Sequence, residues 1–178
     1  MRPRLMLVVA ALFLGGCTAV PDTAPPTDLQ VIPGVPPFAE QSRRDDCAGV
    51  ALASLLAHAG ISVPAEAVDA AVYDRRLGGA LLADLENYAA AAGAVPRSGR
   101  GSLDELRQRL ASGRPVLVPI DLGFAVWRRP HYVVVFGYGA RSVYLHLRAG
   151  QSVEMADAEF ERRWSAMGRL FLYLEPRG

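Results

Sequence analysis

The sequence predicts an α+β fold, in which helices come first in the chain and mostly antiparallel strands follow. Between residues 46 and 112 the apolar residues recur at helical spacing. Beyond Gly113 the pattern changes to short runs rich in β-branched and aromatic residues, bounded by Gly and Pro. The chain has 178 residues and a formal net charge of +1. This length suits one globular domain with a sizeable core, and the charge balance gives no basic surface for nucleic acid.

Four helices are predicted in the first half of this domain. The first covers 46–58, and its small and apolar residues indicate that it is buried. The second covers about 65–73 and the third covers 80–92. The fourth has a clear start, because the letters "SLDE" at 102–105 fit a capping box.

Four strands are predicted after Gly113, in the stretches "RPVLVPIDL", "HYVVVFGY", "RSVYLHLRA" and "RLFLYLEP". A helix at about 156–164 interrupts them, with Asp157 as a candidate cap. Phe160 and Trp164 lie four residues apart in this helix, so we expect them to share its buried face.

The first residues, "MRPRLMLVVAALFLGGC", have the pattern of an export signal. Two arginines precede an apolar run that is too short to span a bilayer comfortably. The letters "LGGC" resemble a bacterial lipobox, in which the cysteine, here Cys17, is lipidated and the preceding residues are removed. An ordinary signal with a cysteine by chance is the alternative. We predict a lipoprotein signal at 1–16, a Pro-rich tether at 17–36 and the domain at 37–178.

Cys47 is one of two cysteines in the chain and falls in the first turn of the first predicted helix. A helix N-terminus favours the thiolate, the reactive form of cysteine, because unpaired backbone N–H groups and the positive end of the dipole face it. If Cys17 carries lipid, Cys47 is the remaining thiol of an exported chain. A disulfide between the two cysteines and a buried core cysteine are the alternatives.

Attack by a thiolate needs a general base and donors aimed at the developing oxyanion. His131 is the candidate base, because it opens an apolar strand directly after a loop. Gln41, six residues before Cys47, is the candidate oxyanion donor together with the backbone N–H of Cys47. Taken singly, each of these residues also has an ordinary structural explanation.

Together these stretches resemble the papain-like cysteine peptidases that process bacteriocin leader peptides at double-glycine sites. The resemblance covers residues 36–176 and rests on the Gln-to-Cys spacing, the alanine-rich helix and the runs "GRPVLVPIDLG" and "PHYVVVFGY". With its lipobox, the chain looks like the exported, stand-alone lipoproteins of that superfamily. The resemblance implies a papain-like peptidase fold, with Cys47 as nucleophile, His131 as general base and acid, and Gln41 as oxyanion donor.

Two positions depart from the pattern of that family. Its Cys-Gly-Pro is replaced here by Cys47-Ala48-Gly49, which a helical first turn tolerates. Its third catalytic member, an Asp or Asn on the strand after the histidine strand, has no counterpart in "YLHLRAG". Asp121 corresponds to the loop before the histidine and not to the catalytic set. Trp127, in the same loop, either lines a cleft or belongs to a hydrophobic loop.

His146 is a possible orienting residue in place of the missing carboxylate. If residues 139–140 form a two-residue hairpin turn, His146 lies opposite Val133 and shares a face with His131. A turn one residue longer sends Leu147 to that face instead. A half-exposed strand residue without a catalytic role is the alternative for His146.

We therefore predict a lipid-anchored cysteine peptidase, or a related thiol-dependent acyl hydrolase, that acts on peptide or protein substrates in the cell envelope. Thr18 after Cys17 resembles the sorting pattern for the outer membrane, so we expect a domain that faces the periplasm. We expect no nucleic acid partner, no cofactor and no metal. The alternative is a catalytically degenerate papain-like module that binds an envelope peptide or protein, and the missing carboxylate is its main support.

Overall fold

The computed structural model describes residues 28–39, 47–124 and 126–176. This part of the chain contains five helices and a seven-stranded sheet of order β2-β7-β3-β4-β5-β6, with β1 paired to β4. The helices are α1 (Cys47–His58), α2 (Ala65–Val72), α3 (Leu82–Ala91), α4 (Leu103–Ala111) and α5 (Asp157–Ser165). The strands are β1 (Gln30–Val31), β2 (Val95–Arg100), β3 (Val116–Asp121), β4 (Pro130–Tyr138), β5 (Ser142–Arg148), β6 (Gln151–Ala156) and β7 (Leu170–Glu175).

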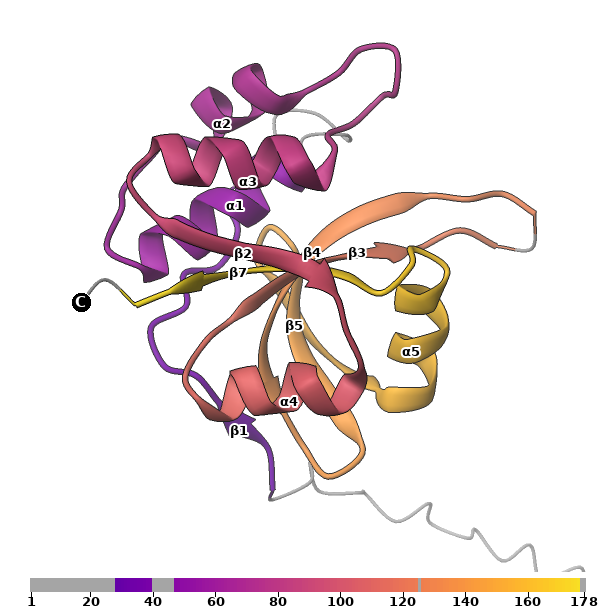
Figure 1. Ribbon diagram of the computed structural model, residues 1–178. Helices are drawn as coiled ribbons and strands as arrows, with labels where there is room; N and C mark the ends of the chain where they lie inside the picture. The colour runs from indigo at the N-terminus through magenta and orange to yellow at the C-terminus, as the bar shows by residue number, and fades with distance from the viewer. Residues whose placement is uncertain (1–27, 40–46, 125, 177–178) are drawn as a thin grey trace, which may run out of the picture.

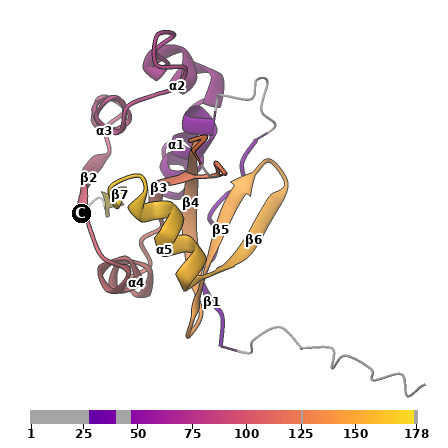
Figure 2. The same ribbon diagram turned by 90° about the vertical axis from the view of Figure 1, so that its right-hand side faces the viewer.

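Neighbouring strands within the described residues all pair antiparallel. Helices cover both faces of the sheet: α1, with α2 and α3 beside it, lies on one face, and α4 and α5 lie on the other (Figures 1 and 2). The predicted α+β fold, with N-terminal helices packed on an antiparallel sheet, is confirmed. No helix in the described ranges is long and apolar enough to cross a membrane.

The strand β4 separates two hydrophobic cores. Its side chains alternate, because successive residues of a strand point to opposite faces. Tyr132, Val134 and Phe136 join the core under α1, whereas Val133 and Val135 join the core under α4 and α5. Because both faces of β4 are covered, the position of its first residues is firmly set.

The predicted helices form close to their expected bounds. The capping box of α4 is present: Glu105 N donates to Ser102 Oγ at 3.3 Å, and Ser102 N donates to Glu105 Oε2 at 2.7 Å. Such a pair satisfies backbone N–H groups that a helix start leaves without partners. Local sequence signals were therefore sufficient to locate these helices.

The helix α5 is confirmed, but its predicted cap is wrong. Phe160 and Trp164 are both buried in the core on this face of the sheet. The N-cap position is Ala156, and no side chain caps the helix there. Asp157 is the first helical residue instead, and its carboxylate pairs with Arg107 at 2.6 Å.

Three strands were missed by the sequence analysis. β2 lies in the half of the chain expected to be helical, and β6 precedes α5; both pair along their length, with β7 and β5 respectively. β1 lies in the expected tether, where Ile32 N donates to Phe136 O at 2.8 Å. Further along, Ser54 Oγ donates to Pro36 O at 2.5 Å. The residues just before position 37 therefore pack against the domain and do not extend away from it.

Of the two hairpin registers considered between β4 and β5, the one with a turn at 139–140 does not form. The turn lies at 140–141, one residue later than predicted. Gly139 N donates to Ser142 O at 2.9 Å and closes it. This later turn shifts the pairing by two positions, and a bulge at 135–137 shifts it back by one. His146 therefore lies opposite Val134 and not opposite Val133.

The close crossing of α1 and α2 requires a glycine near the start of α1. A Cβ on Gly49 would lie 2.7 Å from Ala65 O and 2.9 Å from Asp69 Cβ, closer than such atoms approach. Glycine allows the two helix backbones to meet there. The Cys-Ala-Gly sequence therefore serves helix packing directly beside Cys47.

Candidate active site

Cys47 is the first residue of α1, the helix that packs against β4. Its side chain is 8 % exposed and belongs to the core on this face of the sheet. The backbone N–H of Tyr132 points at the sulfur, with 3.5 Å between N and Sγ. A helix N-terminus and a backbone donor thus both face the thiol, and both stabilise negative charge on sulfur.

His131 directly precedes Tyr132 on β4, so its backbone adjoins the contact between Tyr132 N–H and the Cys47 sulfur. The imidazole is 7 % exposed, and its Nε2 lies 2.6 Å from Leu147 O. A carbonyl oxygen only accepts hydrogen bonds, so Nε2 carries the proton and donates it. In the neutral ring Nδ1 then keeps its lone pair. The contact therefore selects the tautomer in which Nδ1 is the basic nitrogen.

Burial lowers the pKa of His131 below its ordinary value. The charges of Arg148 and Arg129 act in the same direction, because a nearby cation disfavours a second one. The hydrogen bond to Leu147 O opposes them, because the carbonyl stabilises the protonated ring. Near neutral pH the imidazole is accordingly neutral, which is the form that accepts a proton.

Leu147 supplies through its backbone what the sequence lacks in its side chains. It lies on β5, the strand that follows the histidine strand, where the resemblance places an Asp or Asn. Its carbonyl accepts from His131 at the geometry of a strong hydrogen bond. Sequence reasoning missed this group because every residue carries a carbonyl and no residue type signals its use.

His146 lies in a different environment from the one predicted. Its Nδ1 is 2.8 Å from Ser152 Oγ, and its Nε2 is 3.3 Å from Val35 O. The ring stacks on Phe136, with 4.0 Å between ring centroids. Both ring nitrogens therefore have partners other than His131, and the register that suggested an orienting role does not form.

Tyr132 connects the thiol to the segment between α2 and α3. Its phenol donates to Ala80 O at 3.1 Å, while its backbone N–H contacts Cys47. Burial, and next the nearby Cys47, raise the pKa of the phenol above its ordinary value. The hydroxyl therefore stays protonated and holds the α2–α3 connection beside the start of α1.

Asp121 has a structural task in the loop before His131. Its Oδ1 accepts from Gly123 N and from Arg129 N, each at 2.8 Å. The bond from Arg129 is the largest cause that lowers the pKa of this carboxyl group. Trp127, within the loop that Asp121 closes, is 80 % exposed, so it does not line an enclosed cleft.

Two residues of the predicted site, Gln41 and Cys17, lie outside the described residues. Their roles as oxyanion donor and lipidation site stay predictions. Within the described ranges no group of three or more His, Cys, Asp or Glu side chains is placed to hold a metal ion.

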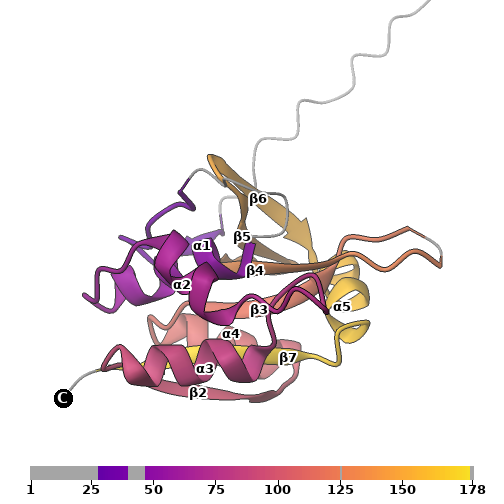
Figure 3. The same cartoon turned by 90° about the horizontal axis from the view of Figure 1, so that it is seen from above.

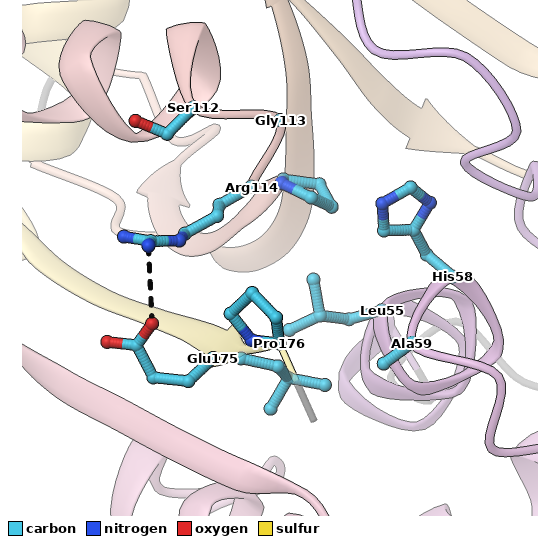
Figure 4. Close-up of a pocket in the computed structure, with 10 residues that line it drawn as sticks. Leu55, His58, Ala59, Ser112, Gly113, Arg114, Glu175 and Pro176 are labelled. Carbon is cyan, nitrogen blue, oxygen red and sulfur yellow. Dashed lines mark ion pairs between the residues drawn. The ribbon is translucent and has the colours of Figure 1, made fainter. Parts of the chain in front are cut away.

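A pocket at the far end of α1 is separate from this site (Figure 4). Leu55 and His58 line it from α1, and Arg114 and Glu175 form an ion pair at 3.5 Å along another wall. Since α1 has 12 residues, its two ends are roughly 18 Å apart. The pocket therefore has no part in the junction of α1 with β4.

Comparison with solved structures identifies similar folds. A putative C39-like peptidase from Bacillus anthracis has 20% identity and a TM-score of 0.68, over 85% of this chain and 99% of the other. A double-glycine-motif protease from an AMS/PCAT transporter, in complex with the leader peptide, has 21% identity and a TM-score of 0.64, over 79% and 91%. The peptidase domain of Streptococcus ComA has 19% identity and a TM-score of 0.63, over 79% and 98%.

A comparison with curated proteins found no match. The sequence was also compared with models of protein families, and residues 36–177 match the model described as the peptidase C39 family. This match spans the helices α1 to α5 and the strands β2 to β7, and it includes Cys47 and His131. The chain belongs to the peptidase C39 family, and so to the cysteine peptidases.

Proposed function

We propose that this protein is a lipid-anchored cysteine peptidase of the cell envelope that cleaves peptide bonds with a Cys47–His131 dyad. One observation carries the proposal: His131 donates through Nε2 to the carbonyl of Leu147 directly beside the residue whose N–H contacts the Cys47 sulfur. A thiol at a helix start and an imidazole held in one tautomer are the two groups that thiol-dependent acyl transfer requires.

The proposed reaction starts from a neutral thiol and a neutral imidazole. His131 Nδ1 takes the proton of Cys47 Sγ, and the thiolate attacks the carbonyl carbon of the peptide bond. Negative charge develops on the substrate oxygen, where the Cys47 N–H and the Gln41 amide are the proposed donors. The imidazolium then gives its proton to the leaving amine. Water, activated by the same nitrogen, hydrolyses the acyl-enzyme and restores the thiol.

The acceptor behind His131 limits the proposed rate. A carbonyl fixes the ring position and tautomer, as a carboxylate does, but it carries no net charge. It therefore stabilises the imidazolium less than Asp would. We expect turnover below that of an enzyme with a full triad, with the same order of steps.

Peptides are the proposed substrates. The similar double-glycine-motif protease was solved with a leader peptide. The stand-alone lipoprotein type rests on the "LGGC" stretch and on Thr18, which favour lipidation of Cys17 and the periplasmic side of the outer membrane. Cys17→Ser should release the chain from the membrane fraction into the soluble fraction; a wild-type chain recovered soluble with residues 1–16 intact would contradict the anchor.

Among the described residues, the hydrogen-bond partner of His131 is a carbonyl and not a carboxylate, and this favours one second candidate function. A papain-like module that has lost activity would keep the fold and bind an envelope peptide or protein at the same junction. Such a module needs no base for its thiol, so the two candidates differ in how the reactivity of Cys47 depends on His131.

Labelling of Cys47 by a thiol-directed peptide electrophile tests the dyad. We expect His131→Ala to slow labelling by at least about tenfold near neutral pH, because the proton of the thiol then lacks its base. His58→Ala, at the far end of α1, is the matched control and should label at the wild-type rate. Cys47→Ser should not label. Equal rates for wild type and His131→Ala would show that no dyad exists and would favour the binding module.

A further inference from the structure

The turn of the β3–β4 hairpin carries the most exposed large apolar side chains of the described residues. Phe124 and Val126 are each 87 % exposed and Trp127 is 80 % exposed, whereas the next, Leu77, is 59 % exposed. We call Phe124, Val126 and Trp127 the hairpin tip. The hairpin extends past the helices and the rest of the sheet (Figures 1 and 3). Apolar groups gathered in this way mark a surface that contacts a partner.

The hairpin below the tip is held in place by hydrogen bonds. Trp127 N donates to Phe124 O at 3.1 Å and closes the turn. Arg128 Nη1 donates to Ala166 O, just after α5, at 2.7 Å. The Asp121 carboxylate joins the two sides of the stem through its two backbone contacts. The tip is therefore presented outward by an ordered stem.

We propose that the hairpin tip inserts into the interfacial layer of a phospholipid bilayer with anionic headgroups. Peptide and small-molecule sites are concave, whereas the hairpin tip lies at the end of a projection. Trp and Phe favour the boundary between headgroups and acyl chains. Arg129 follows the tip and is exposed, which places a cation at the depth of lipid phosphates, whereas the guanidinium of Arg128 is bonded to Ala166 O.

This inference rests on the proposed envelope location for its setting and adds an orientation. A lipid on Cys17 would hold the domain near the membrane without fixing which side faces it. Insertion of the tip would turn the start of β4 toward the bilayer, because Trp127 lies only four residues, or about 13 Å of extended chain, before His131. Peptides that lie on the membrane or emerge from it are then the substrates that reach the site first.

Quenching of tryptophan emission by brominated lipids measures the insertion. The chain has two tryptophans, and Trp164 is buried with 1 % exposure, so the difference between wild type and Trp127→Phe reports Trp127 alone. We use the full chain bound to vesicles of phosphatidylcholine and phosphatidylglycerol with bromine on the acyl chains. The Trp127 signal should fall at least about twofold, while the emission of Trp127→Phe changes little.

Matched variants separate the hairpin tip from the rest of the surface. Phe124→Ser with Val126→Ser should reduce the quenching of Trp127, and Leu77→Ser on the α2–α3 connection should not. Arg129→Glu should reduce it in the anionic vesicles, and Arg97→Glu on β2 should not. The proposal is overturned if Leu77→Ser reduces the quenching as much as the Phe124→Ser, Val126→Ser variant does. It is also overturned if Arg97→Glu reduces it as much as Arg129→Glu does.

Two further outcomes bear on the proposal. Vesicle-bound protein with an unquenched Trp127 overturns it; if the tip variants then raise KM for a soluble peptide without vesicles, the tip contacts substrate instead. The quenching is also measured with Cys47→Ser, which removes the nucleophile. Unchanged quenching in that variant supports insertion whether or not the dyad is active, so the two proposals fail separately.

Discussion

The two buried histidines of the sheet, His131 on β4 and His146 on β5, look alike by burial and by their backbone contacts. They are 7 % and 4 % exposed, and each has Nε2 at a carbonyl oxygen. Their other nitrogens differ. His146 Nδ1 lies at Ser152 Oγ, whereas among the described residues His131 has a hydrogen-bond partner at Nε2 only. His131 also adjoins the N–H that contacts the Cys47 sulfur.

This difference indicates how a buried histidine becomes available for chemistry. One hydrogen bond at Nε2 fixes the ring and its tautomer, and a second at Nδ1 would occupy the basic nitrogen. His146 has both contacts and stacks on Phe136, so its ring joins β5, β6 and the segment of Val35. No described residue is hydrogen-bonded to His131 Nδ1, the nitrogen that we propose takes the proton of Cys47.

Exchanging each histidine for alanine should separate the two roles. We expect His131→Ala to lower kcat/KM for a peptide substrate by about a thousandfold or more, because it removes the base. We expect His146→Ala to lower the free energy of unfolding by about 2–4 kcal/mol, because it leaves a cavity and strands two polar partners. Its kcat/KM, measured well below the unfolding temperature, should stay within about tenfold of wild type.

His146→Gln is the control for this pair, because an amide retains a donor for Val35 O and a partner for Ser152. It should recover part of the lost stability. The comparison breaks if His146→Ala abolishes turnover in protein that circular dichroism shows to be folded, since His146 would then serve the chemistry. It also breaks if His131→Ala keeps full turnover.

The sequence predicted the elements whose signals are local. A buried apolar helix after Cys47, a capping box at Ser102 and strands rich in β-branched residues all formed close to their expected bounds. β2 was missed because its six residues, "VPRSGR", include Pro, Gly and two Arg and carry no strand pattern of their own. It forms through its pairing with β7, a contact between distant parts of the chain.

The hairpin register failed for a comparable reason, although one signal was available. Gly137 interrupts an otherwise apolar strand, and a glycine there often marks a bulge or a close backbone approach. In the structure a Cβ on Gly137 would lie 2.8 Å from Gln30 O of β1, and the β4–β5 pairing shifts at the same place. Cys47 and His131 became candidates because their residue types carry the chemistry, whereas the carbonyl of Leu147 has no such signature.

The pH dependence of stability gives the smallest effect and the finest test of the same comparison. Burial is the largest cause that lowers the pKa of both His131 and His146 below the ordinary value. As pH falls, the unfolded chain takes up these two protons first, so protonation favours unfolding. The stability that the neutral histidines provide is full above about pH 6.5, the pKa of an unfolded histidine, and declines below it.

Each histidine contributes at most about 1.4 kcal/mol per pH unit to this slope. Urea unfolding of wild type, His131→Gln and His146→Gln between pH 7.5 and about pH 5 measures the contributions. Each variant should lose part of the slope below about pH 6.5, because one titrating ring is gone. The acid limb of kcat/KM should follow His131 alone and lie below pH 6.5, since its lowered pKa keeps the base neutral there. If His146→Gln moves that limb and leaves the unfolding slope unchanged, the division of roles between the two histidines is wrong.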